Sequence, residues 1–338
     1  MIKQTLDSQM LKISEIQSKH QEELLNMQNV VGVSIGHNIK NDVESDKPVI
    51  SVLVSHKLDK GLLGSADLIP AKLDGIETDV VETGELFAGN LLSEKVQEDE
   101  IQDFEQVGSS SPFLTRRIRP AMGGYSIGHP KITAGTLGTC CYDLTPFPSK
   151  PDKYYILSNN HVLANSNNAK IGDPILQPGP SDGGRAPGDI IARLSRFIPI
   201  RFMTEKSKPC NYVDAAIAEG NLRDLNREVY WGGYIKKLYA APKVGDIVQK
   251  TGRTTGFTTG KVTNINATVN VNYGNGKIAR FCRQIVTDCM SRGGDSGSIV
   301  MNREEGAVGL LFAGSATRTI LNNILYVQAL LRIRVTEI

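Results

Sequence analysis

Three short segments carry residues whose chemistry and order could drive acyl transfer. His161 follows an apolar run, Asp214 opens another, and Ser296 lies in the glycine-rich stretch 293–297. A serine hydroxyl becomes nucleophilic when a histidine accepts its proton, and a carboxylate beside the histidine fixes the tautomer that this requires. The three segments therefore predict an activated serine, with His161 as general base and Asp214 as the residue that orients it.

The serine segment is the strongest of the three signals. Glycines on both sides of Ser296 predict a tight turn without the Cβ atoms that would hinder an approaching substrate. The backbone N–H groups of Gly294 and Ser296 are the predicted oxyanion donors, each worth about 3–4 kcal/mol. His161 alone would suit an ordinary turn or core position. Asp214 is either a strand cap facing solvent or a buried carboxylate that accepts the His161 Nδ1–H.

The order of these residues resembles that of the chymotrypsin-like (trypsin-like) serine peptidases, which carry His, Asp and Ser in sequence with the serine in Gly-Asp-Ser-Gly. His161 precedes Asp214 by 53 positions (214 − 161), and Ser296 follows Asp214 by 82 (296 − 214). The order of these residues in subtilisin (Asp, His, Ser) and in α/β-hydrolases (Ser, acid, His) does not match this chain. The resemblance covers about residues 123–338 and implies a double β-barrel and a serine endopeptidase that forms an acyl-enzyme.

Within that family, the chain looks closest to intracellular bacterial trypsin-like proteins and plant NARROW LEAF 1-like proteases. The likeness is carried by four short segments of the second half, 134–138, 158–163, 252–256 and 294–298. The stretches VVGVSIGH and LDGIETDVVETG also resemble the leader domain of such proteins.

The resemblance implies a substrate pocket as well. Its base would be formed by Met290 and Ser291, and its opposite wall by Phe312, Ala313 and Gly314. Neither base residue is a carboxylate, so a small-to-medium apolar P1 residue is expected rather than Lys or Arg.

The aspartate before the nucleophile, Asp295, raises a separate question. Secreted digestive members pair this aspartate with a newly freed N-terminal ammonium, but here about 120 residues precede the barrel. Another cation must take that place, and Arg253, Arg283 and Arg292 are the candidates.

Composition limits the partners. Lys+Arg 38 against Asp+Glu 36 gives a formal charge of +2, which favours neither nucleic acid nor an acidic membrane. No apolar stretch approaches the roughly 18 residues of a membrane span, and the N-terminus lacks a signal-peptide pattern. The five cysteines show no zinc spacing, and we expect all five to be reduced thiols in a cytoplasmic protein without metal or cofactor.

The expected fold is mainly β. Residues 1–92 predict a small α+β N-terminal domain with a leading helix, 93–122 a linker, and 123–338 the protease domain. The leading helix packs on its own domain in the favoured interpretation, and a homo-oligomer contact is the alternative. Glycines 252, 256 and 260 resemble a phosphate loop only superficially and indicate a twisted hairpin. A closing helix is expected over 324–333.

The predicted function is a serine endopeptidase acting on protein or peptide substrates, under some form of regulation. One alternative is a catalytically silent protease-like protein used for binding or assembly. Another is a latent protease that its N-terminal domain or oligomer contacts hold inactive.

Overall fold

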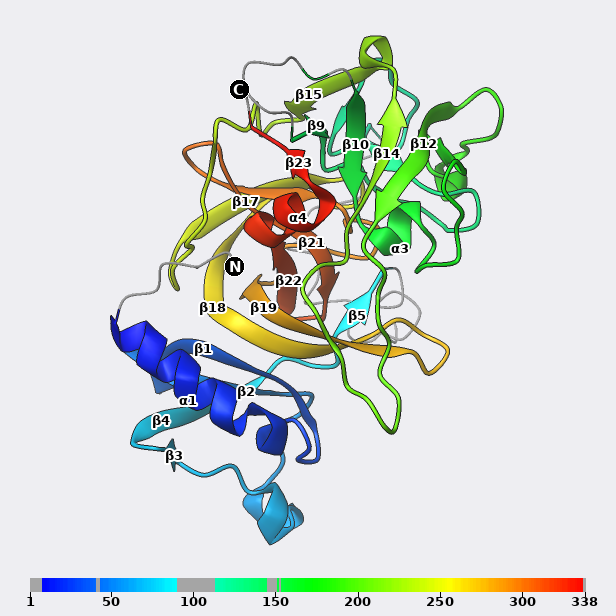
Figure 1. Cartoon of the computed structure of the whole chain (residues 1–338). Coiled ribbons are helices and arrows are strands. Elements are labelled where there is room, and N and C mark those ends of the chain that lie inside the picture. Colours follow the sequence, from blue (N-terminus) through cyan, green and yellow to red (C-terminus); the bar gives the residue numbers. More distant parts are fainter. Residues whose placement is uncertain (1–7, 41–42, 90–112, 145–150, 152, 337–338) are drawn as a thin grey trace.

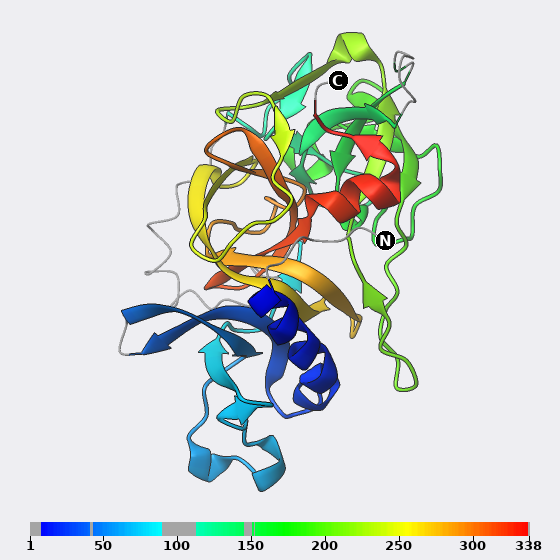
Figure 2. The same ribbon diagram turned by 60° about the vertical axis from the view of Figure 1, so that its left-hand side comes forward.

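A computed structural model describes residues 8–40, 43–89, 113–144, 151 and 153–336, and it confirms the mainly β class (Figure 1). The described strands fall into two main sheets. The N-terminal segment, with its leading helix, lies at one end of the molecule, and the smaller sheet lies at the other (Figure 2). No helix in the described ranges is long and apolar enough to cross a membrane.

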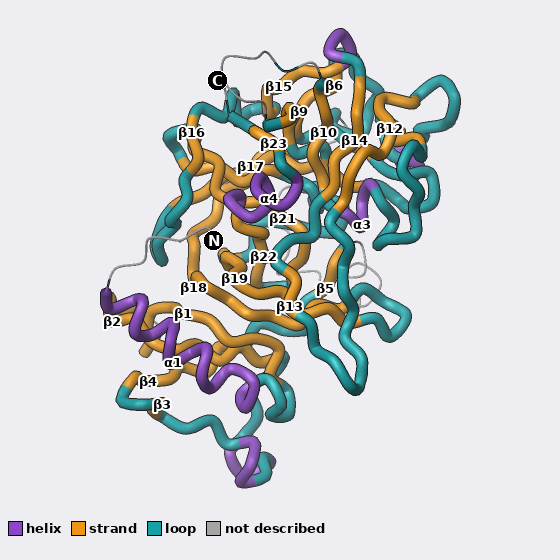
Figure 3. The backbone as a smooth tube through the Cα atoms, viewed as in Figure 1, coloured by secondary structure: helices purple, strands orange, loops and turns teal. Residues whose placement is uncertain are grey.

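The larger sheet follows the order β13-β19-β22-β21-β20-β17-β18-β1-β2-β4-β3, with β5 and β16 joining β21 at its side (Figure 3). Its strands from the second half of the chain are β13 (Cys210–Asn211), β16 (Lys237–Leu238), β17 (Ile247–Gly252), β18 (Gly256–Asn272), β19 (Ile278–Asp288), β20 (Ile299–Asn302), β21 (Gly306–Gly314) and β22 (Arg318–Asn323).

The smaller sheet follows the order β11-β12-β14-β10-β9-β23. These strands are β9 (Thr139–Asp143), β10 (Tyr154–Ser158), β11 (Pro174–Leu176), β12 (Ile190–Phe197), β14 (Ala216–Gly220) and β23 (Ile333–Arg334). Helix α4 (Ile324–Leu331) leads into β23, so the expected closing helix is confirmed. Two short pairs complete the β structure: β6 (Ala121–Gly123) with β15 (Leu225–Val229), and β7 (Ser126–Ile127) with β8 (Gly135–Thr136).

The N-terminal segment shares a sheet with the second half of the chain. It comprises α1 (Ser8–Leu24), β1 (Val30–Lys40), β2 (Val43–Val54), β3 (Lys72–Leu73), β4 (Ile76–Glu82) and β5 (Phe87–Ala88). Strand β1 pairs antiparallel with β18, for example Val33 with Thr268.

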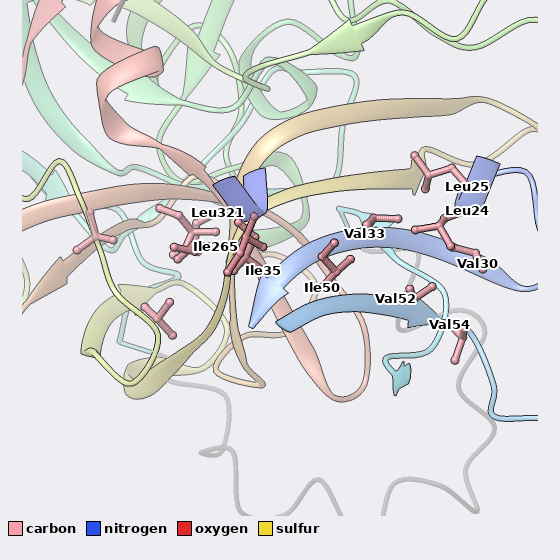
Figure 4. Close-up of a cluster of buried hydrophobic side chains, with 14 of the residues drawn as sticks. Leu24, Leu25, Val30, Val33, Ile35, Ile50, Val52, Val54, Ile265 and Leu321 are labelled. Atoms are coloured by element: carbon pink, nitrogen blue, oxygen red, sulfur yellow. The ribbon is translucent and has the colours of Figure 1, made fainter. Parts of the chain in front are cut away.

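One apolar cluster joins this segment to the larger sheet. Ile35 and Ile50 are fully buried and lie with Ile265 of β18 and Leu321 of β22 (Figure 4). Burying such side chains stabilises the fold by about 1.5–3 kcal/mol each. Most of the predicted linker, residues 93–112, lies outside the described residues.

The cysteine prediction is wrong for two residues. Cys210 and Cys282 form a disulfide, with their Cα atoms 5.8 Å apart. The cause is the parallel pairing of β13 with β19, which sets Cys210 opposite Arg280 and so brings two positions 72 residues apart into contact. Cys140, Cys141 and Cys289 are free.

Candidate active site

A single helical turn carries His161. Helix α3 (Asn160–Leu163) starts directly after β10, and Asn159 precedes it in extended conformation. The Asn159 side chain donates to the backbone oxygen of Asp214 at 2.7 Å, which ties this turn to the start of β14. The turn is therefore held against the smaller sheet, as expected for a histidine placed just beyond a strand.

Asp214 is fully buried, so of its two interpretations the buried one describes its position. Its Oδ2 lies 2.6 Å from His161 Nδ1, and its Oδ1 accepts the backbone N–H of His161 at 3.2 Å. A carboxylate that contacts both the ring and the backbone of one histidine fixes the ring's orientation.

Tyr273 completes the surroundings of this carboxylate and was not expected from the sequence. Its hydroxyl donates to Asp214 Oδ2 at 2.7 Å, and its ring lies edge-on to His161 with centroids 6.1 Å apart. Burial first, and then the Asp214 charge, hold the pKa of Tyr273 well above its usual 10.0. The phenol is therefore a permanent donor at neutral pH.

Ser296 lies in the tight turn that precedes β20. Gly294 and Gly297 both have φ +97°, a conformation that side chains disfavour. A Cβ on Gly297 would lie 2.1 Å from Ser158 Oγ, and one on Gly294 would lie 2.4 Å from Thr254 Oγ1. The glycines are thus required by the tight turn, as predicted, and also by the protein's own packing, which the sequence did not indicate.

Strand β8 joins the serine turn to the histidine turn. The backbone N–H of Thr136 donates to the Ser296 carbonyl at 2.8 Å. A Cβ on Gly135 would lie 2.5 Å from the side chain of Val162, the residue after His161, and 3.1 Å from the Ser296 carbonyl. The structure therefore brings all three predicted residues to one place. His161 Nε2 is buried and has no hydrogen-bond partner among the described residues, Ser296 included.

The two predicted oxyanion donors are unused. In the described part of the chain, the backbone N–H groups of Gly294 and Ser296 donate to no protein group. Unpaired donors beside a serine can bind the oxygen on which charge develops during acyl transfer.

Asp295 finds its cation in Lys250, which corrects the three arginine candidates. Lys250 Nζ lies 3.3 Å from Asp295 Oδ2, and both side chains are fully buried. Arg253 pairs with Asp182 instead, and Arg292 contributes its backbone N–H to Asp295 at 3.0 Å. The signal for Lys250 was its position in β17, where it is buried along with Val248 and Gly252.

The turn between β17 and β18 supplies the remaining donors to Asp295. The backbone N–H groups of Thr254 and Thr255 reach Oδ1 at 2.9 and 3.1 Å, and the Thr255 hydroxyl reaches Oδ2 at 2.6 Å. Gly252 faces Gly256 across this turn, so the expected hairpin is confirmed. Burial lowers the pKa of Lys250, while the charge of Asp295 opposes that shift.

The predicted pocket residues come together only in part. Ser291 Oγ lies 2.8 Å from Thr319 Oγ1, and a Cβ on Gly314 would lie 3.7 Å from Ser291 Oγ. Ser291 of the predicted base and Gly314 of the predicted opposite wall therefore face each other. Met290 packs in the apolar cluster of the larger sheet. Phe312 and Ala313 are buried along β21 in a neighbouring cluster.

No family model matches the chain, and no curated protein is similar to it. Among solved structures, protease A of Thermobifida fusca is 14% identical with a TM-score of 0.43, covering 63% of this chain and 96% of that one. A chymotrypsin of Cellulomonas bogoriensis is 18% identical with a TM-score of 0.42, over 63% and 96%. A protease of Nocardiopsis is 17% identical with a TM-score of 0.45, over 64% and 98%. At these identities the likeness concerns the fold alone.

Proposed function

We propose that this protein is a serine endopeptidase that hydrolyses peptide bonds through Ser296, His161 and Asp214. The observation that carries the proposal is the buried Asp214 carboxylate, which contacts the ring and backbone of His161 near the glycine-rich serine turn. A buried carboxylate costs free energy unless hydrogen bonds or a cation stabilise it. The side-chain partners of Asp214 are the His161 ring and the Tyr273 hydroxyl.

In the proposed mechanism, His161 Nε2 accepts the Ser296 proton as Oγ attacks the peptide carbonyl. Asp214 keeps the other ring proton on Nδ1 and stabilises the imidazolium that forms. The N–H groups of Gly294 and Ser296 bind the oxyanion. His161 then protonates the leaving amine, and water hydrolyses the acyl-enzyme. This route needs no cofactor.

The substrate preference follows from the residues around Ser291 and Gly314. Because the predicted pocket base carries no carboxylate, we expect a small-to-medium apolar residue at P1. A peptide library cleaved mainly after Lys or Arg would contradict this preference. The narrower likeness to intracellular bacterial and NARROW LEAF 1-like proteases is part of the proposal. A cytoplasmic location is also part of the proposal, although the Cys210–Cys282 disulfide removes the argument from five reduced cysteines.

The test is prolonged labelling of the full-length protein with a fluorophosphonate, read by intact mass. We expect one adduct on wild type and on the exposed-site control Ser181→Ala, and none on Ser296→Ala. An adduct that persists on Ser296→Ala would overturn the assignment of the nucleophile. Absence of any adduct, even when the N-terminal segment has been displaced by the substitutions given below, would favour the silent binding protein.

A further inference from the structure

Strand β5 leaves the other N-terminal strands and adds to the edge of β21 (Figure 1). The two strands run antiparallel, with Ala88 opposite Ala313 and Phe87 opposite Gly314. On its other side, β5 lies against the end of β18, where the Asn272 N–H donates to the Leu86 carbonyl at 2.8 Å. A two-residue strand from the N-terminal segment thus sits within the second half of the molecule.

The edge that β5 occupies is the wall assigned above to the substrate. An extended peptide binds an exposed sheet edge through its main chain, by adding a strand. Continuing the observed register by one residue sets Gly89 opposite Phe312. Residues 86–89 therefore occupy the positions that substrate residues on the acyl side of the scissile bond would need.

Gly89 lies directly against the proposed general base. A Cβ added to Gly89 would be 3.7 Å from His161 Cδ2 and 3.9 Å from His161 Nε2. His161 Nε2 is inaccessible to solvent and Ser296 is only 4% exposed. His161 Nε2 and Ser296 are therefore shielded from solvent, and Gly89 is one of the residues that shield them.

We propose that residues 86–89 are a built-in occupant of the β21 edge, which closes the site until the segment leaves. The activity of the opened site rests on the proposed function, whereas the occupation of the β21 edge by residues 86–89 is independent of that function. The partner that fits this surface is an extended polypeptide with a small side chain at the position of Ala88, and here the chain supplies it.

The segment is placed to block rather than to react. Gly89 has φ +71°, so the chain turns at the residue opposite Phe312 instead of continuing as a strand. Within the described ranges, the N–H groups of Gly294 and Ser296 remain without an acceptor, so no carbonyl of residues 86–89 is polarised for attack. Release breaks the few hydrogen bonds of a two-residue strand and exposes the buried side chains of Leu86, Phe87 and Ala88, so a signal or partner must supply that free energy.

The test displaces the segment and measures access to the edge. Ala88 is 4% exposed, so Ala88→Glu would bury a carboxylate and force β5 out. Ala71→Glu is the matched control, because Ala71 is an exposed alanine of the same segment. The probe is a fluorescein-labelled peptide of the sequence Leu-Phe-Ala-Gly, bound to full-length proteins that also carry Ser296→Ala. We expect at least tenfold tighter binding with Ala88→Glu and no change with Ala71→Glu.

The same substitutions with Ser296 intact are then labelled with the fluorophosphonate, and we expect at least tenfold faster labelling for Ala88→Glu. Equal peptide binding, or equal labelling rates, in wild type and Ala88→Glu would overturn the proposed occupation. Tighter peptide binding without any labelling would support the occupation and contradict the proposed peptidase.

If Ala88→Glu does not unfold cooperatively, Gly89→Val replaces it. Valine disfavours the positive φ of Gly89, and its side chain would meet His161. The matched control is Gly75→Val, where φ is +87° but an added Cβ would meet nothing within 4 Å. Faster labelling by Gly89→Val alone supports the proposal, and identical rates for the two valine variants contradict it.

Discussion

Asp214 and Asp295 are both fully buried, but their surroundings differ in charge. Asp295 has a lysine and three backbone N–H groups around it. Asp214 has a phenol, a histidine ring and one backbone N–H. The first carboxylate has the Lys250 side chain as a partner, whereas the second has no lysine or arginine among its hydrogen-bond partners in the described chain.

This difference separates two tasks. The contacts of Asp295 with Lys250 and with three backbone N–H groups hold the serine turn independently of the protonation of His161. The charge of Asp214 stays available to stabilise an imidazolium when His161 accepts a proton. Substitutions at the two sites should therefore differ in kind, with activity lost at Asp214 and stability lost at Asp295.

The largest effect is expected from Asp214→Asn. An asparagine amide would donate to Nδ1 and stabilise the wrong tautomer, so acylation should slow about 10⁴-fold. The rate of fluorophosphonate labelling measures this, and circular dichroism checks that the fold is kept. A loss below tenfold would mean that Asp214 serves structure alone.

Lys250→Met should mainly destabilise the fold. It leaves the buried Asp295 without its cation, which costs about 3–5 kcal/mol in the free energy of unfolding measured in urea. Lys47→Met is the control, because the Lys47–Glu77 pair is largely exposed on the lysine side and contributes about 0–1 kcal/mol. Adding Asp295→Asn to Lys250→Met should recover part of the loss, and no recovery would show that charge was not the cause.

Tyr273→Phe removes one donor to a buried carboxylate and should cost about 1.5–3 kcal/mol. The pKa of Tyr273 is raised above its usual 10.0, so above pH 10.0 the unfolded chain loses a proton that the native protein keeps. The stability that Tyr273 contributes is complete below that pH and is lost as pH rises further. Urea unfolding should show that the difference in free energy of unfolding between wild type and Tyr273→Phe decreases as pH rises above 10.0. A difference that does not change with pH would contradict the shifted pKa.

Thr255→Val should have the smallest effect, about 1–2 kcal/mol. It removes the hydroxyl that lies between Lys250 and Asp295 but leaves the three backbone N–H donors to Asp295 in place. Thr255→Ser keeps the hydroxyl and should unfold close to wild type. Equal losses in both variants would point to packing of the threonine methyl group instead.

The sequence predicted those parts of the site that depend on local pattern. Residue periodicity predicted the leading helix and the closing helix, and the order of His161, Asp214 and Ser296 along the chain predicted that all three belong to one site. The glycines around Ser296 predicted the tight turn, whereas the close packing that also requires them could not be predicted from local pattern.

The partners of the two aspartates could not be predicted, because they depend on long-range pairing. Tyr273 reaches Asp214 across 59 positions from beyond the end of β18. Lys250 was detectable only as a charge at a buried position of β17, and the arginines nearer in the sequence were the more obvious candidates. The two-residue β5 has no sequence pattern of its own.

The pairing of β1 with β18 also protects the molecule from self-association. Residues 264–269 of β18 present one row of backbone groups to β1, between the apolar Ile265 and Val269. Without the N-terminal strands this row would be an unprotected edge, ready to pair with any other extended chain. Loss of the N-terminal segment would therefore make the remainder prone to aggregate unless another strand replaced β1.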